Sequence, residues 1–106
     1  MNTVDVKISS RARSLLNTAA KWNRSETSEC APNPKTDGLF CALVQARLDI
    51  TGDSKTRTAA FAEARAVVEE LTQGRKYEHR LMEYNNDRNT TFRDVENVLQ
   101  LVLIPG

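Results

Sequence analysis

The sequence predicts an all-α fold, a compact single-domain bundle of four to five short helices. Apolar side chains recur at spacings of three and four residues along most of the chain, as in amphipathic helices. No alternation of apolar and polar residues persists for long enough to predict a strand. At 106 residues the chain has the length of one domain, without an internal repeat or a low-complexity tract. We therefore expect one helical domain over residues 1–106.

Each predicted helix carries its apolar side chains on one face. The predicted helices are residues 5–23, 39–49, 55–73 and 76–84, and a last segment from Phe92 to Val102. Gly52 is expected to end the second helix and Asp53-Ser54 to cap the third. Thr91-x-x-Asp94 resembles a capping box at the start of the last helix. Leu48 and Leu71 are expected to face the core.

Residues 24–38 form the one clear irregular segment. Pro32 and Pro34 lack a backbone donor and bias the preceding residues away from helix. A connection of this length in a small domain is usually functional or disordered. A second polar loop, residues 85–90, contains no apolar side chain. These two loops are the places where the sequence predicts a functional site.

Composition excludes several classes of protein. The formal net charge is +1, from 15 basic and 14 acidic residues, which argues against a protein that coats nucleic acid. No apolar run approaches the roughly 18 residues of a membrane-spanning helix, and the N-terminus does not resemble a secretory signal. We expect a cytoplasmic protein, a monomer or small homo-oligomer, that uses no metal and no cofactor.

The two cysteines, Cys30 and Cys41, are too few for a disulfide scaffold or a structural zinc site. A bridge between them would close a short loop and stabilise the fold by about 2–3 kcal/mol in the loop-entropy description. Because the cytoplasm keeps thiols reduced, we expect both cysteines to be free.

An enzymatic alternative rests on Cys41 and His79. Cys41 is expected in the first turn of a helix, where unpaired backbone N–H groups and the helix dipole favour a thiolate. His79 follows it in the chain, as the base follows the nucleophile in papain-like hydrolases. Against this alternative, Cys41 has apolar neighbours, and a buried cysteine commonly serves as a small core residue.

The predicted binding site combines the two polar loops. Its residues are Asp37, Asn85, Asn86, Asp87 and Arg88. The Asn-rich loop lacks the alternating acidic residues of a calcium loop, and a structural role in a turn is the favoured interpretation. If the helices pack as expected, Asp37 and Asp87 approach each other at one end of the bundle.

The order of several motifs resembles the family called domain of unknown function 6197, small proteins of bacteria and phages. The matching positions are Trp22, Asp37, Gly38, Cys41, Ala42, Leu43, Asn86, Asp87, Thr91 and Val95. The resemblance covers roughly residues 10–104, and no activity is established for the family. It implies a helical fold and an origin in a bacterium or a phage.

These observations predict a small non-enzymatic protein-binding module with an unidentified protein partner. The resemblance adds an accessory protein of a phage or mobile element that acts on a host protein. Two alternatives stay open. One is the small cysteine hydrolase described above. The other is a weak nucleic-acid binder that uses the basic first helix, where Lys7, Arg11, Arg13, Lys21 and Arg24 oppose one acidic residue.

Overall fold

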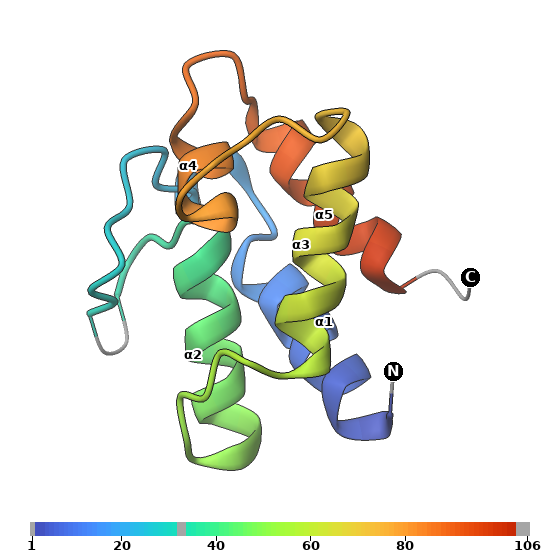
Figure 1. Cartoon of the computed structure of the whole chain (residues 1–106). Coiled ribbons are helices and arrows are strands. Elements are labelled where there is room, and N and C mark those ends of the chain that lie inside the picture. The colour runs from blue at the N-terminus through green and yellow to red at the C-terminus, as the bar shows by residue number, and fades with distance from the viewer. Residues whose placement is uncertain (1, 32–33, 104–106) are drawn as a thin grey trace.

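The computed structural model describes residues 2–31 and 34–103 of the chain. Over these residues it contains five α-helices and one 3₁₀ turn, and no strand (Figure 1). The elements are α1 (Thr3–Leu15), η1 (Ala19–Lys21), α2 (Leu39–Thr51), α3 (Ala59–Leu71), α4 (Arg80–Asn86) and α5 (Phe92–Leu103). The predicted all-α class is therefore confirmed. Pro32 lies outside the described residues.

Helix α1 lies at the centre of the packing and contacts α2, α5 and α3. Its inner face consists of Ile8 and Ala12, both fully buried, and Leu16 continues this face just beyond the helix. Ala60 and Ala64 on α3 are also fully buried, and their small side chains let the helices approach closely. Burial of a large apolar side chain such as Ile8 or Leu16 contributes about 1.5–3 kcal/mol to the stability of the fold.

The first helix is shorter than the sequence predicts, because α1 ends at Leu15 rather than at residue 23. Leu16 is the C-cap, and its N–H still bonds to the Ala12 carbonyl. The Arg13 guanidinium donates to the Leu16 carbonyl at 3.4 Å, which satisfies one of the groups left at the helix end. Asn17 and Thr18 follow, and both residue types are weak helix formers.

Two side chains predicted to face the core are exposed instead. Leu48 is 38% exposed and Leu71 is 44% exposed. Both lie in the last turns of their helices. Periodicity assigns a side chain to a face of a helix, but it does not show how far along the helix its neighbours extend.

Three predicted starts of helices can be compared with the structure. Helix α3 begins at Ala59, not at residue 55, and its N-cap is Thr58 rather than Asp53-Ser54. Helix α4 begins at Arg80, not at residue 76. The capping box before α5 is confirmed, since the Asp94 carboxylate accepts the Thr91 N–H at 2.8 Å and the Thr91 hydroxyl accepts the Asp94 N–H at 3.2 Å.

The two ends of the segment between η1 and α2 lie next to each other. Trp22 and Asp37 form an isolated parallel bridge, in which the Asp37 N–H bonds to the Lys21 carbonyl and the Asn23 N–H bonds to the Asp37 carbonyl. The described part of the 24–38 loop is thus closed at its base, next to the start of α2. Within the described residues, no helix is long and apolar enough to cross a membrane.

Candidate functional site

Asn85 joins the two polar loops. Its side-chain oxygen accepts the Trp22 indole N–H at 2.7 Å and the Leu39 backbone N–H at 2.9 Å. Its amide nitrogen donates to the Asn23 carbonyl and to the Asn86 side-chain oxygen, both at 2.9 Å. Asn85 is fully buried. Its amide therefore serves the structure, because all four of its bonding directions are used inside the protein.

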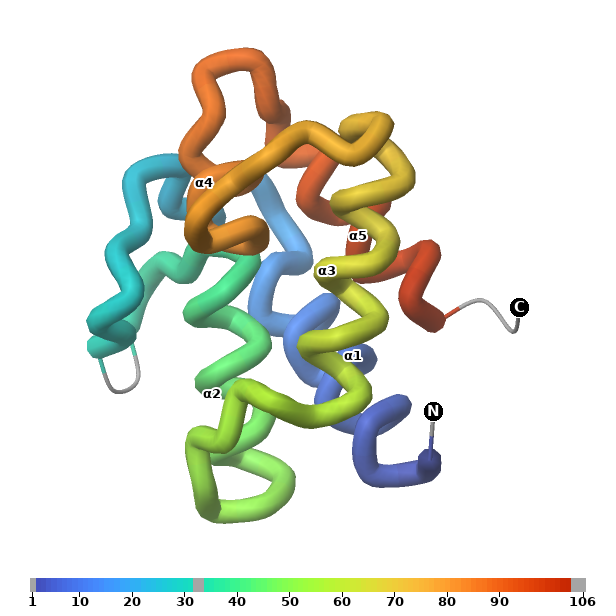
Figure 2. Tube along the Cα trace, viewed as in Figure 1, coloured from blue at the N-terminus to red at the C-terminus, as the bar shows by residue number. Residues whose placement is uncertain are grey.

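Asn86 and Arg24 extend the junction. The Asn86 side chain accepts the Glu26 N–H at 3.0 Å and donates to the Glu26 carbonyl at 2.7 Å, as a strand neighbour would. Arg24 donates to the carbonyls of Arg88 at 3.2 Å and Thr90 at 2.8 Å. In Figure 2 the cyan segment after Trp22 and the orange loop after α4 accordingly lie side by side.

The predicted binding residues are therefore brought to one end of the bundle but serve different purposes. Asn85 and Asn86 point inward and hold the loops together. Asp87 forms an ion pair with Arg75 at 2.9 Å, and the Arg88 side chain is exposed. Among the described residues, no hydrogen bond or ion pair links Asp87 to Asp37. The expected meeting of these two carboxylates is not observed.

Glu26 caps helix α2 from outside the helix. One carboxylate oxygen accepts the Phe40 N–H at 3.0 Å and the other accepts the Cys41 N–H at 2.9 Å. The residue is only 4% exposed, and this burial, augmented by the charge of Asp37, raises the pKa of Glu26 to about 7. The sequence gives no sign of this role of Glu26, because a capping side chain 14 residues from the residue it caps has no sequence signature.

Gly38 makes room for that cap. A Cβ on Gly38 would lie 2.7 Å from Glu26 Cγ and closer still to its carboxyl group. The φ of Gly38 is −90°, which any residue adopts, so space rather than backbone conformation requires glycine here. The predicted start of the second helix at residue 39 is correct, and the space that the Glu26 side chain needs explains why glycine precedes it.

Cys30 and Cys41 form a disulfide, so the prediction of two free thiols is wrong for this structure. The loop closes because its base is held by the Trp22–Asp37 bridge and because Glu26 positions the first turn of α2. The bonded Cys41 carries no thiolate. His79 caps α4 and contacts the Phe40 ring, with centroids 4.5 Å apart, so the structure offers no support for a Cys41–His79 pair.

A cleft of about 260 Å³ opens beside the disulfide, which we call the disulfide cleft. Its walls include both cysteines, Glu26 and Asp37. Asp37 is 7% exposed, and its carboxylate has no hydrogen-bond or ion-pair partner among the described residues. Burial, followed by the charge of Asp49, raises the pKa of Asp37 to about 6.

A second cleft, of about 330 Å³, lies between α3 and the start of α4, and we call it the arginine cleft. It is lined by Arg65, Tyr77, Glu78, His79 and Arg80. His79 is the N-cap of α4: its Nδ1 accepts the Met82 N–H at 3.2 Å, and the Glu83 carboxylate accepts the His79 N–H at 2.8 Å. This reciprocal capping starts α4 at Arg80 and so places Arg80 opposite Arg65.

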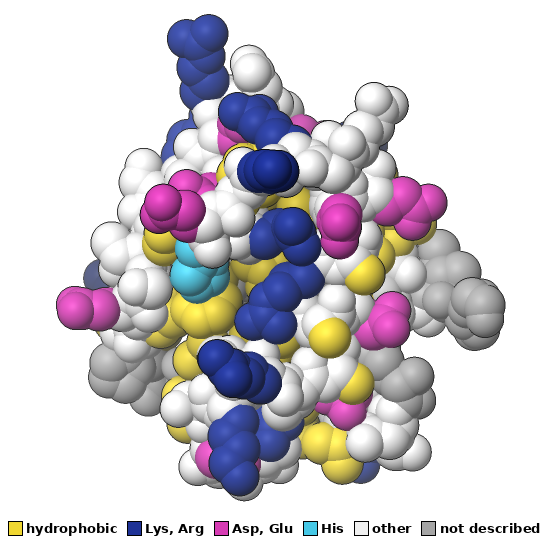
Figure 3. Space-filling view, in the orientation of Figure 1, with side chains coloured by type: hydrophobic (Ala, Val, Ile, Leu, Met, Phe, Trp, Pro, Cys, Tyr) yellow, Lys and Arg dark blue, Asp and Glu magenta, His cyan; other side chains and the backbone are white. Residues whose placement is uncertain are grey.

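Positive charge is crowded at the arginine cleft. Desolvation, and then the nearby charges of Arg80 and Arg57, lower the pKa of Arg65. Among the described residues, a single ion pair reaches these three arginines, Arg80 to Glu69 at 3.5 Å. Arg80 Nε is buried and has no hydrogen-bond partner among the described residues. Figure 3 shows a column of Lys and Arg side chains along this face of the molecule.

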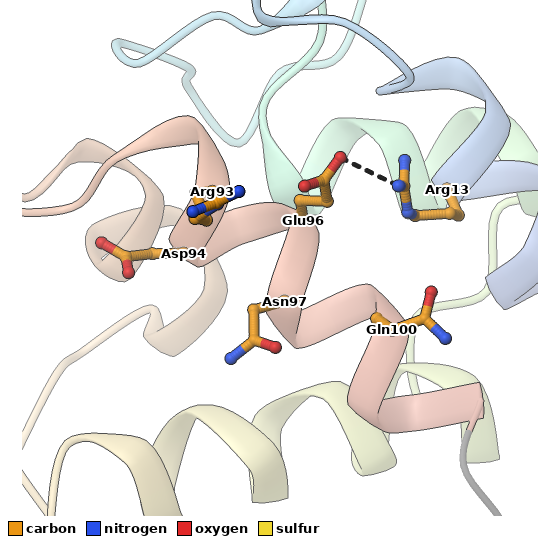
Figure 4. Close-up of a pocket in the computed structure, with 6 residues that line it drawn as sticks. All are labelled: Arg13, Arg93, Asp94, Glu96, Asn97 and Gln100. Atoms are coloured by element: carbon orange, nitrogen blue, oxygen red, sulfur yellow. Dashed lines mark hydrogen bonds and ion pairs between the residues drawn. The ribbon is translucent and has the colours of Figure 1, made fainter.

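A third cleft, of about 550 Å³, has balanced charges and no such excess. Figure 4 shows Arg93, Asp94, Glu96, Asn97 and Gln100 projecting from α5, with Arg13 of α1 facing them. Glu96 accepts from Arg13 at 2.8 Å, and Asp94 is already engaged in the capping box. Its charged groups thus largely satisfy one another.

The basic first helix is similarly neutralised. Arg11 pairs with Asp49 at 3.0 Å and Arg13 pairs with Glu96. These partners come from α2 and α5, so the sequence of the first helix did not reveal them. The positive surface that the structure offers lies on α3 and α4 instead.

No group of three or more His, Cys, Asp or Glu side chains that could hold a metal ion occurs in the described part of the chain. Compared with known proteins, the chain matches no protein-family model, no curated protein and no solved structure. The resemblance to the domain of unknown function 6197 family therefore stays a prediction.

Proposed function

We propose that the protein is a small non-enzymatic binding module that docks an acidic segment of another protein in the arginine cleft. The observation that carries the proposal is that Arg65 and Arg80 line one cleft, with Arg57 near enough to lower the pKa of Arg65, and that among the described residues one carboxylate, Glu69, is paired to them. Crowded guanidinium groups repel one another, and a carboxylate between them removes that repulsion. Guanidinium groups also bind carboxylates through two parallel hydrogen bonds, which fixes the orientation of the bound carboxylate.

The walls of the cleft favour a protein partner over a nucleic acid. Tyr77 and His79 supply flat side chains, and the Arg75 guanidinium lies 5.2 Å from the Tyr77 ring centroid. Tyrosine and arginine dominate the energetics of protein interfaces. Glu78 also lines the cleft and would repel a continuous phosphate backbone. The overall charge of +1 gives no long-range attraction for nucleic acid.

Titration of a fluorescently labelled glutamate-rich peptide, followed by anisotropy, tests the proposal. We expect wild-type protein to bind it, with an affinity that falls as salt is added. Arg65→Glu should weaken binding at least tenfold, which corresponds to about 1.4 kcal/mol or more. Arg93→Glu is the matched control, because Arg93 lies in the charge-balanced cleft on α5.

Two results would contradict the proposal. The first is that the peptide does not bind specifically: either the wild type does not bind it, or both variants lose binding equally. The second is that duplex DNA binds more tightly than the peptide and that this binding depends on Arg65, which would favour a nucleic-acid ligand at the arginine cleft. Circular dichroism of both variants separates loss of binding from loss of fold.

The remaining sequence predictions stand beside this proposal. The family resemblance supports a phage or mobile-element accessory protein whose acidic target belongs to the host. A cytoplasmic location, and a monomer or small homo-oligomer, likewise remain proposals. Disulfides of cytosolic proteins are usually transient and either catalytic or redox-sensing. A cytoplasmic location therefore requires that the Cys30–Cys41 disulfide be of this kind.

A further inference from the structure

We propose that the Cys30–Cys41 disulfide exchanges with uncharged or cationic thiols that enter the disulfide cleft, and that Cys30 is the sulfur they attack. This activity lies outside the proposed binding function and uses a different cleft. Four features of the cleft support it: which sulfur is reachable, where the other sulfur lies, the unpartnered carboxylate of Asp37, and the charges that line the approach.

Accessibility distinguishes the two sulfurs. Both cysteines line the cleft, but Cys41 is 6% exposed whereas Cys30 is only partly buried. A thiolate must approach the sulfur it attacks along the S–S axis, so it reaches Cys30 more readily. Cys41 is then the leaving group.

The leaving group lies at a favourable place. Cys41 is the third residue of α2, and the N-terminal end of a helix stabilises a developing thiolate. The Glu26 carboxyl group accepts the Cys41 backbone N–H at 2.9 Å and so holds this first turn of α2 in place. The polar atom next to Cys41 Sγ is the Thr27 carbonyl oxygen, at 3.3 Å.

Asp37 is the independent observation that points to a ligand. It is more than nine-tenths buried, lines the cleft, and has no hydrogen-bond or ion-pair partner among the described residues. A structural disulfide does not require such a group. A bound amine or N–H donor beside the attacking thiol would satisfy the Asp37 carboxylate.

Charge selects the thiol. Glu29 and Asp37 supply the negative charge of the cleft wall, Glu26 adds to it above about pH 7, and no lysine or arginine is among its described lining residues. Asp49 adds a further negative charge at Asp37. An anionic thiol is therefore repelled, whereas a thiol that carries an ammonium group is attracted.

The exchange proceeds in two balanced steps. The thiolate RS⁻ bonds to Cys30 Sγ, the S–S bond breaks, and its electron pair goes to Cys41 Sγ, which takes a proton from solvent. A second RS⁻ then attacks the sulfur of R in the mixed disulfide and releases Cys30 as thiolate, which also takes a proton from solvent. The outcome is RSSR and two protein thiols: the protein is reduced by two electrons and the thiol is oxidised by two. The reverse reaction with RSSR restores the disulfide.

The test compares two small thiols of similar size and opposite charge, cysteamine and 2-mercaptoethanesulfonate, with the folded protein. Purified without reductant, the protein should contain no free thiol. Per thiolate, cysteamine should reduce the disulfide at least tenfold faster than the sulfonate. Asp37→Asn should lower that ratio several-fold, whereas Glu63→Gln, an exposed change on α3, should leave it unchanged.

Trapping with cystamine, the disulfide of cysteamine, then identifies the attacked sulfur. Cys41→Ser should give a mass adduct at Cys30, and folded Cys30→Ser should give much less at Cys41. Equal rates with the two thiols, reduction that occurs only in denaturant, or faster trapping at Cys41 would overturn the proposal. The wild-type rates decide the matter even if a cysteine variant fails to fold.

Discussion

At the scale of single residues, Asn85 explains how two loops far apart in sequence become one structure. It is fully buried, and its amide bonds Trp22, Asn23, Leu39 and Asn86. The sequence indicated a structural asparagine in this loop, because asparagine commonly bonds the backbone of its own turn. It did not indicate the three distant partners, Trp22, Asn23 and Leu39, which lie 46 to 63 residues away.

Replacing Asn85 by alanine should lower the free energy of unfolding by about 3 kcal/mol or more. The change leaves the Trp22 indole N–H, the Leu39 N–H and the Asn23 carbonyl without their partner, and each unmet buried group costs about 1–3 kcal/mol. Chemical denaturation measures this. The matched change Asn89→Ala, at an exposed position in the loop that follows α4, should alter stability by less than about 0.5 kcal/mol. Similar losses for the two variants would contradict the role given to Asn85.

Gly38 allows a second test at this scale. Gly38→Ala should destabilise the fold by about 1–3 kcal/mol, because the new methyl group collides with the Glu26 side chain. In a Glu26→Ala background the same substitution should cost much less, since the collision is then absent. A double-mutant cycle from denaturation midpoints measures the coupling. Additive effects would show that Gly38 is required for another reason.

At the scale of helices, the chain caps two N-termini with carboxylates from distant segments. Asp5 of α1 accepts the Ala60 N–H at the start of α3, at 3.0 Å, and Glu26 does the same for α2. The N-caps themselves, Thr58 and Gly38, make no side-chain capping bond. Sequence patterns locate local caps, as they did at Thr91. They cannot locate a cap supplied through tertiary structure, and this is why the start of α3 was predicted four residues early.

Glu26 also makes stability depend on pH. The carboxyl group ordinarily loses its proton near pH 4.5, but in the fold its pKa is about 7, so the folded chain holds a proton that the unfolded chain has lost. The stability this group contributes is complete below about pH 4.5 and is lost as pH rises to 7. Asp37, whose pKa rises from 3.8 to about 6, acts in the same direction between those values.

We therefore expect Glu26 alone to make the protein about 2 kcal/mol less stable at pH 7.5 than at pH 5. Urea unfolding at these two pH values measures the difference in the free energy of unfolding. Glu26→Gln keeps the volume and cannot ionise, so its pH dependence should be weaker by that amount. Glu29→Gln, an exposed change in the same loop, should keep the wild-type dependence. An unchanged slope in Glu26→Gln would mean that Glu26 does not titrate in this range.

At the scale of the whole molecule, a near-neutral chain sorts its charges into separate regions. The arginines of α1 pair with acids from other helices, Arg65 and Arg80 line one cleft with Arg57 nearby, and acidic groups line the disulfide cleft. The sequence predicted the all-α class because helical periodicity is local. It did not predict either cleft, since the arginines are 8 and 15 residues apart along the chain and meet only through the packing of α3 against α4.

The central claim is that an acidic protein segment binds at the arginine cleft. The most direct measurement is a two-dimensional NMR titration of isotope-labelled protein with the glutamate-rich peptide. The account predicts that the largest shifts occur at Arg57, Arg65 and residues 77–80, with Arg93 and its neighbours on α5 unaffected. Shifts concentrated on α5, or spread evenly over the surface, would contradict it.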